Sequence, residues 1–149
     1  MSDIRQNVLQ AARDYYRMMI DDLEEKQKNY RAQIERENEP TDLDQRSQAD
    51  MASEDMRREN EQLIQARQGL ALLEQMDERS NHDQVENGSI VHTDQSRFLL
   101  GVAVPHFDVN GQKYLGVSRE SPAYAQMHGK QPGDQVEVEG NTYQIEAVY

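Results

Sequence analysis

The side chains best suited to chemistry are six carboxylates gathered in one short stretch: Glu35, Glu37, Glu39, Asp42, Asp44 and Asp50. Carboxylate oxygens suit Mg²⁺, which usually keeps several waters and takes one or two carboxylates together with phosphate. Asp42 and Asp44 are therefore candidate ligands that would complete a Mg²⁺ site belonging to another molecule. In the alternative interpretation the cluster is solvated, and the two aspartates only cap a helix.

A second set of candidates is Glu120, Ser121 and Pro122, which come directly after an alternating segment typical of a strand. Serine is a favoured helix N-cap and proline is favoured at the first helical position, so a short helix should begin here. Gly129 can end that helix. The three residues would then form an exposed corner where a partner's helix docks, although capping alone also explains Ser121 and Pro122.

Several classes of site are not expected. The chain has no cysteine, which removes disulfides, thiolate chemistry and cysteine-bound zinc. The four histidines, His82, His92, His106 and His128, are scattered and form no ligand set. No glycine-rich phosphate loop is present. We therefore expect no catalytic residue and no cofactor of the protein's own.

Composition indicates an extended helical part beside a small domain. Of the 149 residues 36% are hydrophobic and 30% charged, and the mean hydropathy is −1.00, which is too polar for one spherical core. The net charge of −12 argues against direct binding to duplex DNA. No apolar run approaches the roughly 20 residues of a membrane span. Five charged side chains lie among the first twenty residues, so no signal peptide is visible, and a cytoplasmic protein is expected.

The segment from Asp3 to about Glu39 contains neither glycine nor proline and predicts one long helix. Its apolar positions step by three and four residues, as in a coiled-coil seam with one polar position, Lys26. The predicted seam is Leu9, Ala12, Tyr16, Met19, Leu23, Lys26 and Tyr30.

A turn at Pro40 should end this helix, and Thr41 can cap a second helix with Asp44 three residues on. The second helix runs to about Glu78, with Gly69 as a weak point. Its predicted seam is Ala49, Ala52, Met56, Leu63, Ala66, Leu70 and Leu73. Two helices of matched length joined by a short turn predict an antiparallel hairpin within a monomer.

The organisation expected is a coiled-coil hairpin over 1–79 with its acidic tip near 39–50, a polar linker over 80–88 and a β domain over 89–149. Period-two patterns predict about five strands at 89–93, 97–104, 112–117, 136–139 and 142–148. Asn110-Gly111 and Gly140-Asn141 are hairpin signals. The expected core is Phe98, Leu100, Val102, Leu115, Val117, Met127, Val136, Val138, Ile145 and Val148.

Residues 114–138 resemble the C-terminal domain of the GreA/GreB transcript-cleavage factors. The segment Val117-Ser-Arg-Glu-Ser-Pro is similar to the family's strand ending in Asp-Ser-Pro, with Glu120 in place of Asp. Gly129-Lys130 and Gly133-Asp134-x-Val136 match the family pattern as they stand. The resemblance implies an α+β fold, in which an N-terminal antiparallel helical hairpin precedes a small FKBP-like β domain with one short helix.

The resemblance also implies a function. Members of the family enter the secondary channel of bacterial RNA polymerase, where the β domain grips the channel rim and the hairpin tip helps to hold a catalytic Mg²⁺ for hydrolysis of backtracked RNA. Glu120, Ser121 and Pro122 would then bind polymerase, and Asp42 and Asp44 would ligate Mg²⁺ jointly with it. The chain would modulate elongation through the polymerase's own activity and would not itself be an enzyme.

The tip departs from the family pattern, because Gln45 stands where the family has a glutamate. An amide lacks the charge that makes a carboxylate a good Mg²⁺ ligand. The chain would therefore either stimulate cleavage with Asp44 in compensation or only occupy the channel. Two other functions stay open, namely a coiled-coil adaptor outside transcription and a prolyl isomerase, which the low aromatic content disfavours.

Overall fold

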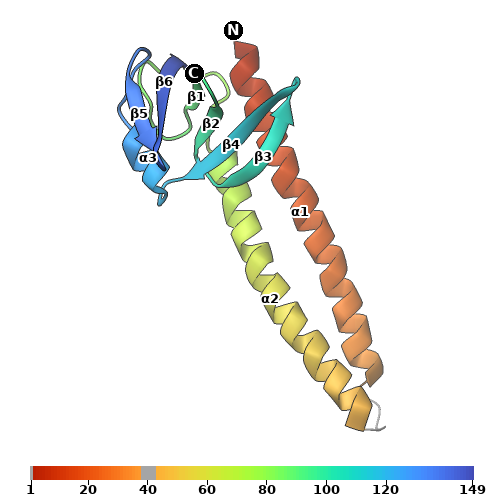
Figure 1. The fold of residues 1–149 in the computed structure, drawn as a ribbon. Helices are drawn as coiled ribbons and strands as arrows, with labels where there is room; N and C mark the ends of the chain where they lie inside the picture. Colours follow the sequence, from red (N-terminus) through yellow and green to blue (C-terminus); the bar gives the residue numbers. More distant parts are fainter. Residues whose placement is uncertain (1, 38–42) are drawn as a thin grey trace. The chain divides into compact units, whose positions relative to one another are not determined.

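The computed structural model describes residues 2–37 and 43–149 (Figure 1). Two long helices come first, α1 (Ser2–Glu37) and α2 (Leu43–Glu74). They are followed by β1 (Ile90–Thr93), β2 (Arg97–Gly101), β3 (Val104–Val109), β4 (Gln112–Ser118), the short helix α3 (Pro122–Met127), β5 (Gln135–Val138) and β6 (Asn141–Val148). The predicted α+β class is confirmed, with a helical hairpin preceding a small β domain that carries one short helix. None of the described helices combines the length and the apolar composition that crossing a bilayer requires.

Contacts between backbone positions divide the chain into two compact units. The β unit comprises residues 1–14 and 71–149, and the hairpin unit comprises residues 15–70. The ends of both long helices thus pack with the strands. The domain boundaries expected at 79 and 89 stay a prediction.

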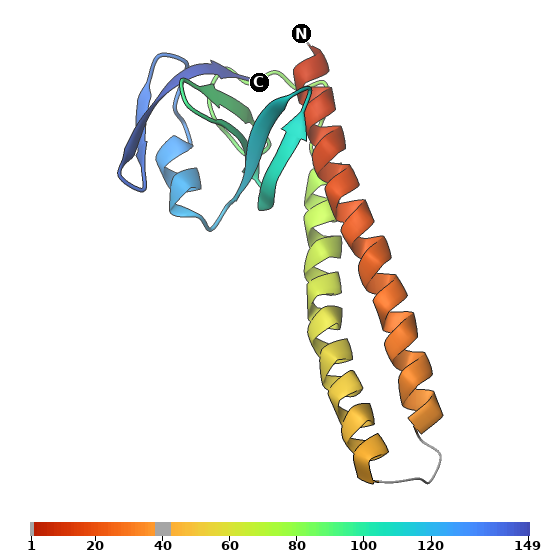
Figure 2. The same ribbon diagram turned by 45° about the vertical axis from the view of Figure 1, so that its right-hand side comes forward.

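In the hairpin unit, α1 and α2 lie side by side and antiparallel, as both views show (Figures 1 and 2). Leu23, Leu63 and Ala66 are buried between them, as predicted. The predicted polar position of the seam is wrong by one residue: the Lys26 side chain is half exposed, whereas Gln27 is buried. The Gln27 amide donates to the carbonyl oxygen of Met56 at 3.0 Å, which satisfies it inside the seam.

The predicted weak point at Gly69 has a packing reason. A Cβ at Gly69 would lie 2.6 Å from the ring of Tyr16. The absence of a side chain therefore lets the bulky tyrosine of α1 approach the backbone of α2. This contact offsets part of the roughly 1 kcal/mol by which glycine disfavours a helix.

The β unit contains a six-stranded sheet in the order β3-β4-β2-β1-β6-β5. All neighbouring strands pair antiparallel except β2 and β4, which are parallel with Phe98 opposite Leu115. Asn110 and Gly111 have φ of 52° and 82°, which confirms the hairpin turn predicted between β3 and β4. The last hairpin turns one residue earlier than predicted, at Glu139 and Gly140, with φ of 51° and 81°.

The single strand predicted over 97–104 is wrong, because the chain leaves β2 at Gly101 and starts β3 at Val104. Gly101 has φ +123°, a conformation that side chains with a Cβ rarely adopt. Pro105 lacks an N–H and was not expected in a strand, but β3 lies at the sheet edge, where a missing donor is tolerated.

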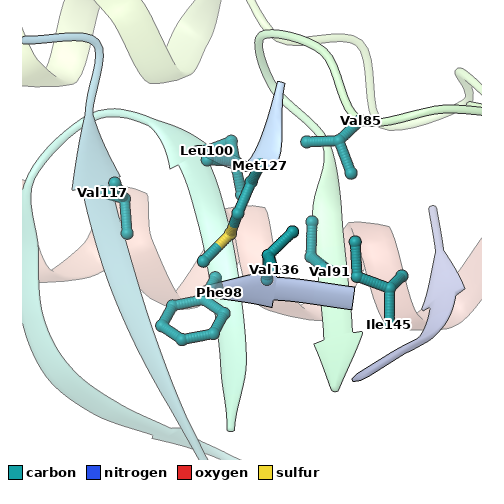
Figure 3. Close-up of a cluster of buried hydrophobic side chains, with 8 residues drawn as sticks. All are labelled: Val85, Val91, Phe98, Leu100, Val117, Met127, Val136 and Ile145. Atoms are coloured by element: carbon teal, nitrogen blue, oxygen red, sulfur yellow. The ribbon is translucent and has the colours of Figure 1, made fainter. Parts of the chain in front are cut away.

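One face of the sheet carries the hydrophobic core of the β unit (Figure 3). Its buried members are Val85, Val91, Phe98, Leu100, Val117, Met127, Val136 and Ile145, with Leu115, Val138 and Val148 packed against them. Val102 is also buried but lies outside this cluster. Val85 and Val91 were not expected, and Val85 comes from the segment predicted to be a polar linker.

Candidate functional site

The predicted corner forms where β4 meets α3. The chain turns after Ser118, whose carbonyl oxygen accepts a hydrogen bond from the Ser121 N–H at 3.1 Å. The Ser121 Oγ then accepts from the Ala123 N–H at 3.2 Å, so the serine caps α3 and Pro122 occupies its first turn.

The corner leaves a carboxylate and a proline ring at the surface of the β unit. Glu120 and Pro122 are exposed and Ser121 is half-buried. The Glu120 carboxylate forms no ion pair within the described part of the chain. A rigid, capped turn with a free carboxylate and an exposed proline ring can present both groups to a basic partner with little loss of entropy. Binding of polymerase by these three residues stays a prediction.

The far end of α3 is held by the segment that precedes the sheet. The Val85 N–H donates to the Lys130 carbonyl at 2.8 Å, and the Gly129 N–H donates to the Val85 carbonyl at 2.7 Å. Gly129 has φ +82° and ends the helix, as predicted. The corner and its helix are therefore fixed at both ends.

The Gly133-Asp134 part of the sequence pattern also has a structural role. Gly133 has φ +96° and donates to the Ile145 carbonyl at 2.8 Å, while the Asp134 carboxylate accepts from the Gln131 N–H at 2.8 Å. These bonds place the turn at the start of β5 against β6. This part of the pattern that resembles the Gre factors thus fixes the turn that leads into β5.

The second predicted site, the acidic tip, is only partly within the described residues. Asp42 lies outside them. Asp44 lies in the first turn of α2, but its side chain is outside the described part, as are those of Gln45 and Asp50. Elsewhere in the described chain no three histidine, aspartate or glutamate side chains gather as a metal site would require. Ligation of Mg²⁺ by Asp42 and Asp44 stays a prediction.

Two buried arginines of α1 were missed from the sequence. Arg13 donates from Nε and Nη2 to the Leu73 carbonyl at 3.2 and 2.8 Å, and from Nη2 to the Met76 carbonyl at 2.9 Å. Its Nη1 pairs with the Glu78 carboxylate. The last carbonyls of a helix have no partner inside the helix, so Arg13 acts as a C-terminal cap for α2.

Arg5 also donates to backbone carbonyls, in this case those of residues that follow the end of α2. It donates to the Asp77 carbonyl at 2.9 and 2.6 Å and to the Gly88 carbonyl at 2.6 Å. Burial lowers the pKa of its guanidinium from the usual value. The sequence did contain a signal, because Arg5, Leu9 and Arg13 are four residues apart and share the buried face of one helix.

His82 lies in the segment between α2 and β1, where its side chain contacts two other residues of that segment. Its Nδ1 contacts the Ser89 Oγ, and its Nε2 lies 3.3 Å from the Glu86 carboxylate. The Ser89 Oγ also accepts from the Glu86 N–H at 2.9 Å, so the serine hydroxyl links the imidazole to the backbone of Glu86. Burial, and secondarily the charge of Arg5, lower the pKa of His82.

His92 occupies a comparable position on β1. Its Nε2 lies 2.9 Å from the Tyr114 hydroxyl beside a cavity of about 390 Å³ that α1 and the β3–β4 hairpin enclose. Burial lowers the pKa of His92 and raises that of Tyr114, and Arg97 contributes to the lowering at His92. Both half-buried histidines are therefore held in their neutral form.

These two histidines predict a loss of stability on mild acidification. Because their folded pKa values lie below the usual 6.5, the unfolded chain binds more protons than the folded chain as pH falls below about 6.5. Their neutral forms contribute full stability above that pH and progressively less below it. The urea midpoint should fall between pH 7.5 and 5.5, and it should fall less in a His82→Gln, His92→Gln variant. An equal fall in both proteins would assign the effect to other groups.

Comparisons with known proteins identify solved structures with a similar course of the chain, and two of them are described here. No family model and no curated protein matches the sequence. A structure described as the transcription factor Gfh1 is 15% identical, with a TM-score of 0.38 over 93% of this chain and 94% of that chain. GreA factor homolog 1 (Gfh1) of Thermus thermophilus is 11% identical, with a TM-score of 0.36 over 93% and 95%.

Proposed function

We propose that this chain is a Gre-like factor that binds bacterial RNA polymerase at its secondary channel and modulates elongation. The observation that carries the proposal is the corner at Glu120, Ser121 and Pro122. It combines the residues that resemble the family's Asp-Ser-Pro segment with an exposed carboxylate and proline on a rigidly capped turn. An exposed carboxylate on a preorganised turn favours a basic partner surface.

The hairpin supplies the second half of the proposed mechanism. Its helices are antiparallel, so the last turn of α1 and the first turn of α2 lie at the same end of the hairpin unit. Asp42 and Asp44 would act there on a Mg²⁺ held mainly by polymerase. A second cation promotes hydrolysis by activating water and neutralising the leaving oxygen. In this proposal the protein is a cytoplasmic monomer with no catalytic residue and no cofactor of its own.

Direct contact with duplex DNA forms no part of the proposal. The net charge of −12 opposes binding to a phosphate backbone. The same charge is compatible with entry into a channel that contains Mg²⁺ and basic side chains.

The tip should decide whether bound polymerase cleaves its RNA faster. In a backtracked complex we expect weak stimulation of RNA cleavage, because Gln45 replaces the carboxylate that the family uses. An Asp42→Asn, Asp44→Asn variant should lose about tenfold or more of that stimulation while still binding polymerase, since an amide ligates Mg²⁺ far less well. Gln45→Glu should raise it. The measurement is the rate of RNA shortening as the Mg²⁺ concentration is varied.

A Glu25→Gln, Glu61→Gln variant is the matched control, because it removes two charges from exposed positions of the hairpin unit. If the tip variant stimulates cleavage as well as the wild type does, the tip does not deliver metal ligands. If neither the wild type nor Gln45→Glu stimulates cleavage but both bind, the protein only occupies the channel.

A coiled-coil adaptor outside transcription is the second candidate. Exposed apolar side chains on the hairpin unit favour it: Met18, Met51 and Ile64 are 72, 66 and 48% exposed. Purified polymerase distinguishes the two candidates. Failure of the wild-type chain to bind core polymerase would leave the adaptor as the better proposal.

A further inference from the structure

The β unit contains a cavity that the proposed function does not use. Its volume is about 480 Å³, which lies within the range of small-molecule sites. Residues of β2, β3, β4 and β6 line it together with the turn before β2. The lining residues are Gln95, Ser96, Arg97, Phe98, His106, Gln112, Lys113, Leu115 and Tyr143.

The charge of this cavity is opposite to that of the protein. Arg97 and Lys113 line it, and no carboxylate does. They are two of only four lysines and arginines in residues 86–149, which carry eight acidic residues. A concave surface lined by one sign of charge concentrates the field and attracts the opposite charge.

Neither cation is neutralised within the described part of the chain. Asp108 is the register partner of Lys113 across the β3–β4 hairpin, yet no ion pair joins them. Arg97 is half-buried beside the neutral His92 and also forms no ion pair there. Arg97 lines this cavity and also the cavity beside His92 and Tyr114. A half-buried guanidinium without a counter-ion at such a position is suited to bind an anion from outside.

The rest of the lining is apolar or hydrogen-bonding. Phe98 and Leu115 contribute the apolar part, and the Tyr143 ring meets Phe98 edge to face with centroids 5.8 Å apart. His106, Gln95 and Gln112 add groups that can donate hydrogen bonds. A ligand that satisfied the whole lining would need an anionic group and an aromatic or apolar body.

We infer that this cavity binds a small organic phosphate monoester whose body is aromatic or apolar. A phosphate monoester carries close to two negative charges at neutral pH and offers three acceptor oxygens, which matches one guanidinium and one ammonium. A carboxylate would leave one of the cations uncompensated. Inorganic phosphate has no apolar body to contact the part of the lining that Leu115 and Tyr143 contribute.

Phenyl phosphate is the minimal probe, and titration of the isotopically labelled chain by NMR is the test. We expect saturable shifts of the amide signals of β2, β4 and β6, with a dissociation constant of about 1 mM or below. Inorganic phosphate should bind several-fold more weakly, because it lacks the ring, and phenol should produce no saturable shift. Polymerase is absent from this experiment, so its outcome is independent of the proposed function.

Two charge-removing variants locate the site. Lys113→Gln alters an exposed side chain and should keep the fold while weakening phenyl phosphate binding about tenfold. Arg97→Gln should weaken it at least as much. Lys130→Gln is the matched control, because it removes the same charge from an exposed position outside the cavity, and it should change binding less than about twofold.

The inference is overturned if phenyl phosphate causes no saturable shift up to about 10 mM, which corresponds to a binding free energy too small for a built site. It is also overturned if Lys113→Gln binds as tightly as Lys130→Gln. Equal affinities for phenyl phosphate and inorganic phosphate would show that the phenyl ring contributes nothing to binding. That result would contradict the proposed class of ligand, a phosphate monoester with an aromatic or apolar body.

Discussion

Replacing Arg13 by methionine is expected to destabilise the β unit by about 3 kcal/mol. Methionine occupies a similar volume but donates no hydrogen bond. The carbonyl oxygens of Leu73 and Met76 and the carboxylate of Glu78 would lose their donors at a site where Arg13 is only 9% exposed. The urea midpoint, followed by circular dichroism, should fall by roughly 1 to 2 M.

Two further variants identify the cause of this loss. Arg57→Met changes an exposed arginine of α2 and should stay within about 0.5 kcal/mol of the wild type. Arg13→Lys keeps the charge but not the planar fork that reaches two carbonyls and a carboxylate, and it should recover less than half of the loss. If Arg13→Met were as stable as Arg57→Met, water would satisfy the carbonyls and Arg13 would not be needed as a cap.

Reversing the charge of Glu120 is expected to weaken binding to core polymerase by about tenfold or more. The carboxylate is exposed on a turn fixed by Ser118 and Ser121, so a lysine there would leave the fold intact and present a positive charge to the basic surface that we propose as its partner. The dissociation constant should be measured at two salt concentrations, because attraction between exposed charges is screened by salt.

Glu146→Lys is the matched control for this charge reversal. Glu146 is an exposed residue of β6, and its replacement changes the net charge by the same amount. If both variants bind polymerase as tightly as the wild type, the corner is not the docking site. If both lose affinity equally, net charge and not the corner governs binding.

Local sequence signals determined the corner and most of the secondary structure. Ser121, Pro122 and Gly129 act within a single turn of chain, where capping and backbone preferences decide the conformation without distant contacts. The same holds for the hairpin turn at Asn110 and Gly111. The two long helices were predictable because their apolar spacing extends over many turns, although the seam was displaced from Lys26 to Gln27.

Only the tertiary structure decided which chain segments meet. Gly101 ends β2 because its left-handed conformation redirects the chain into an edge strand, and Val85 is buried because α3 packs over the segment that precedes the sheet. Arg5 and Arg13 are satisfied by carbonyls sixty or more positions away. Arg97 and Lys113 come from separate strands and line one cavity only through the sheet order. Such long-range pairings depend on packing and burial, which no local pattern of residues encodes.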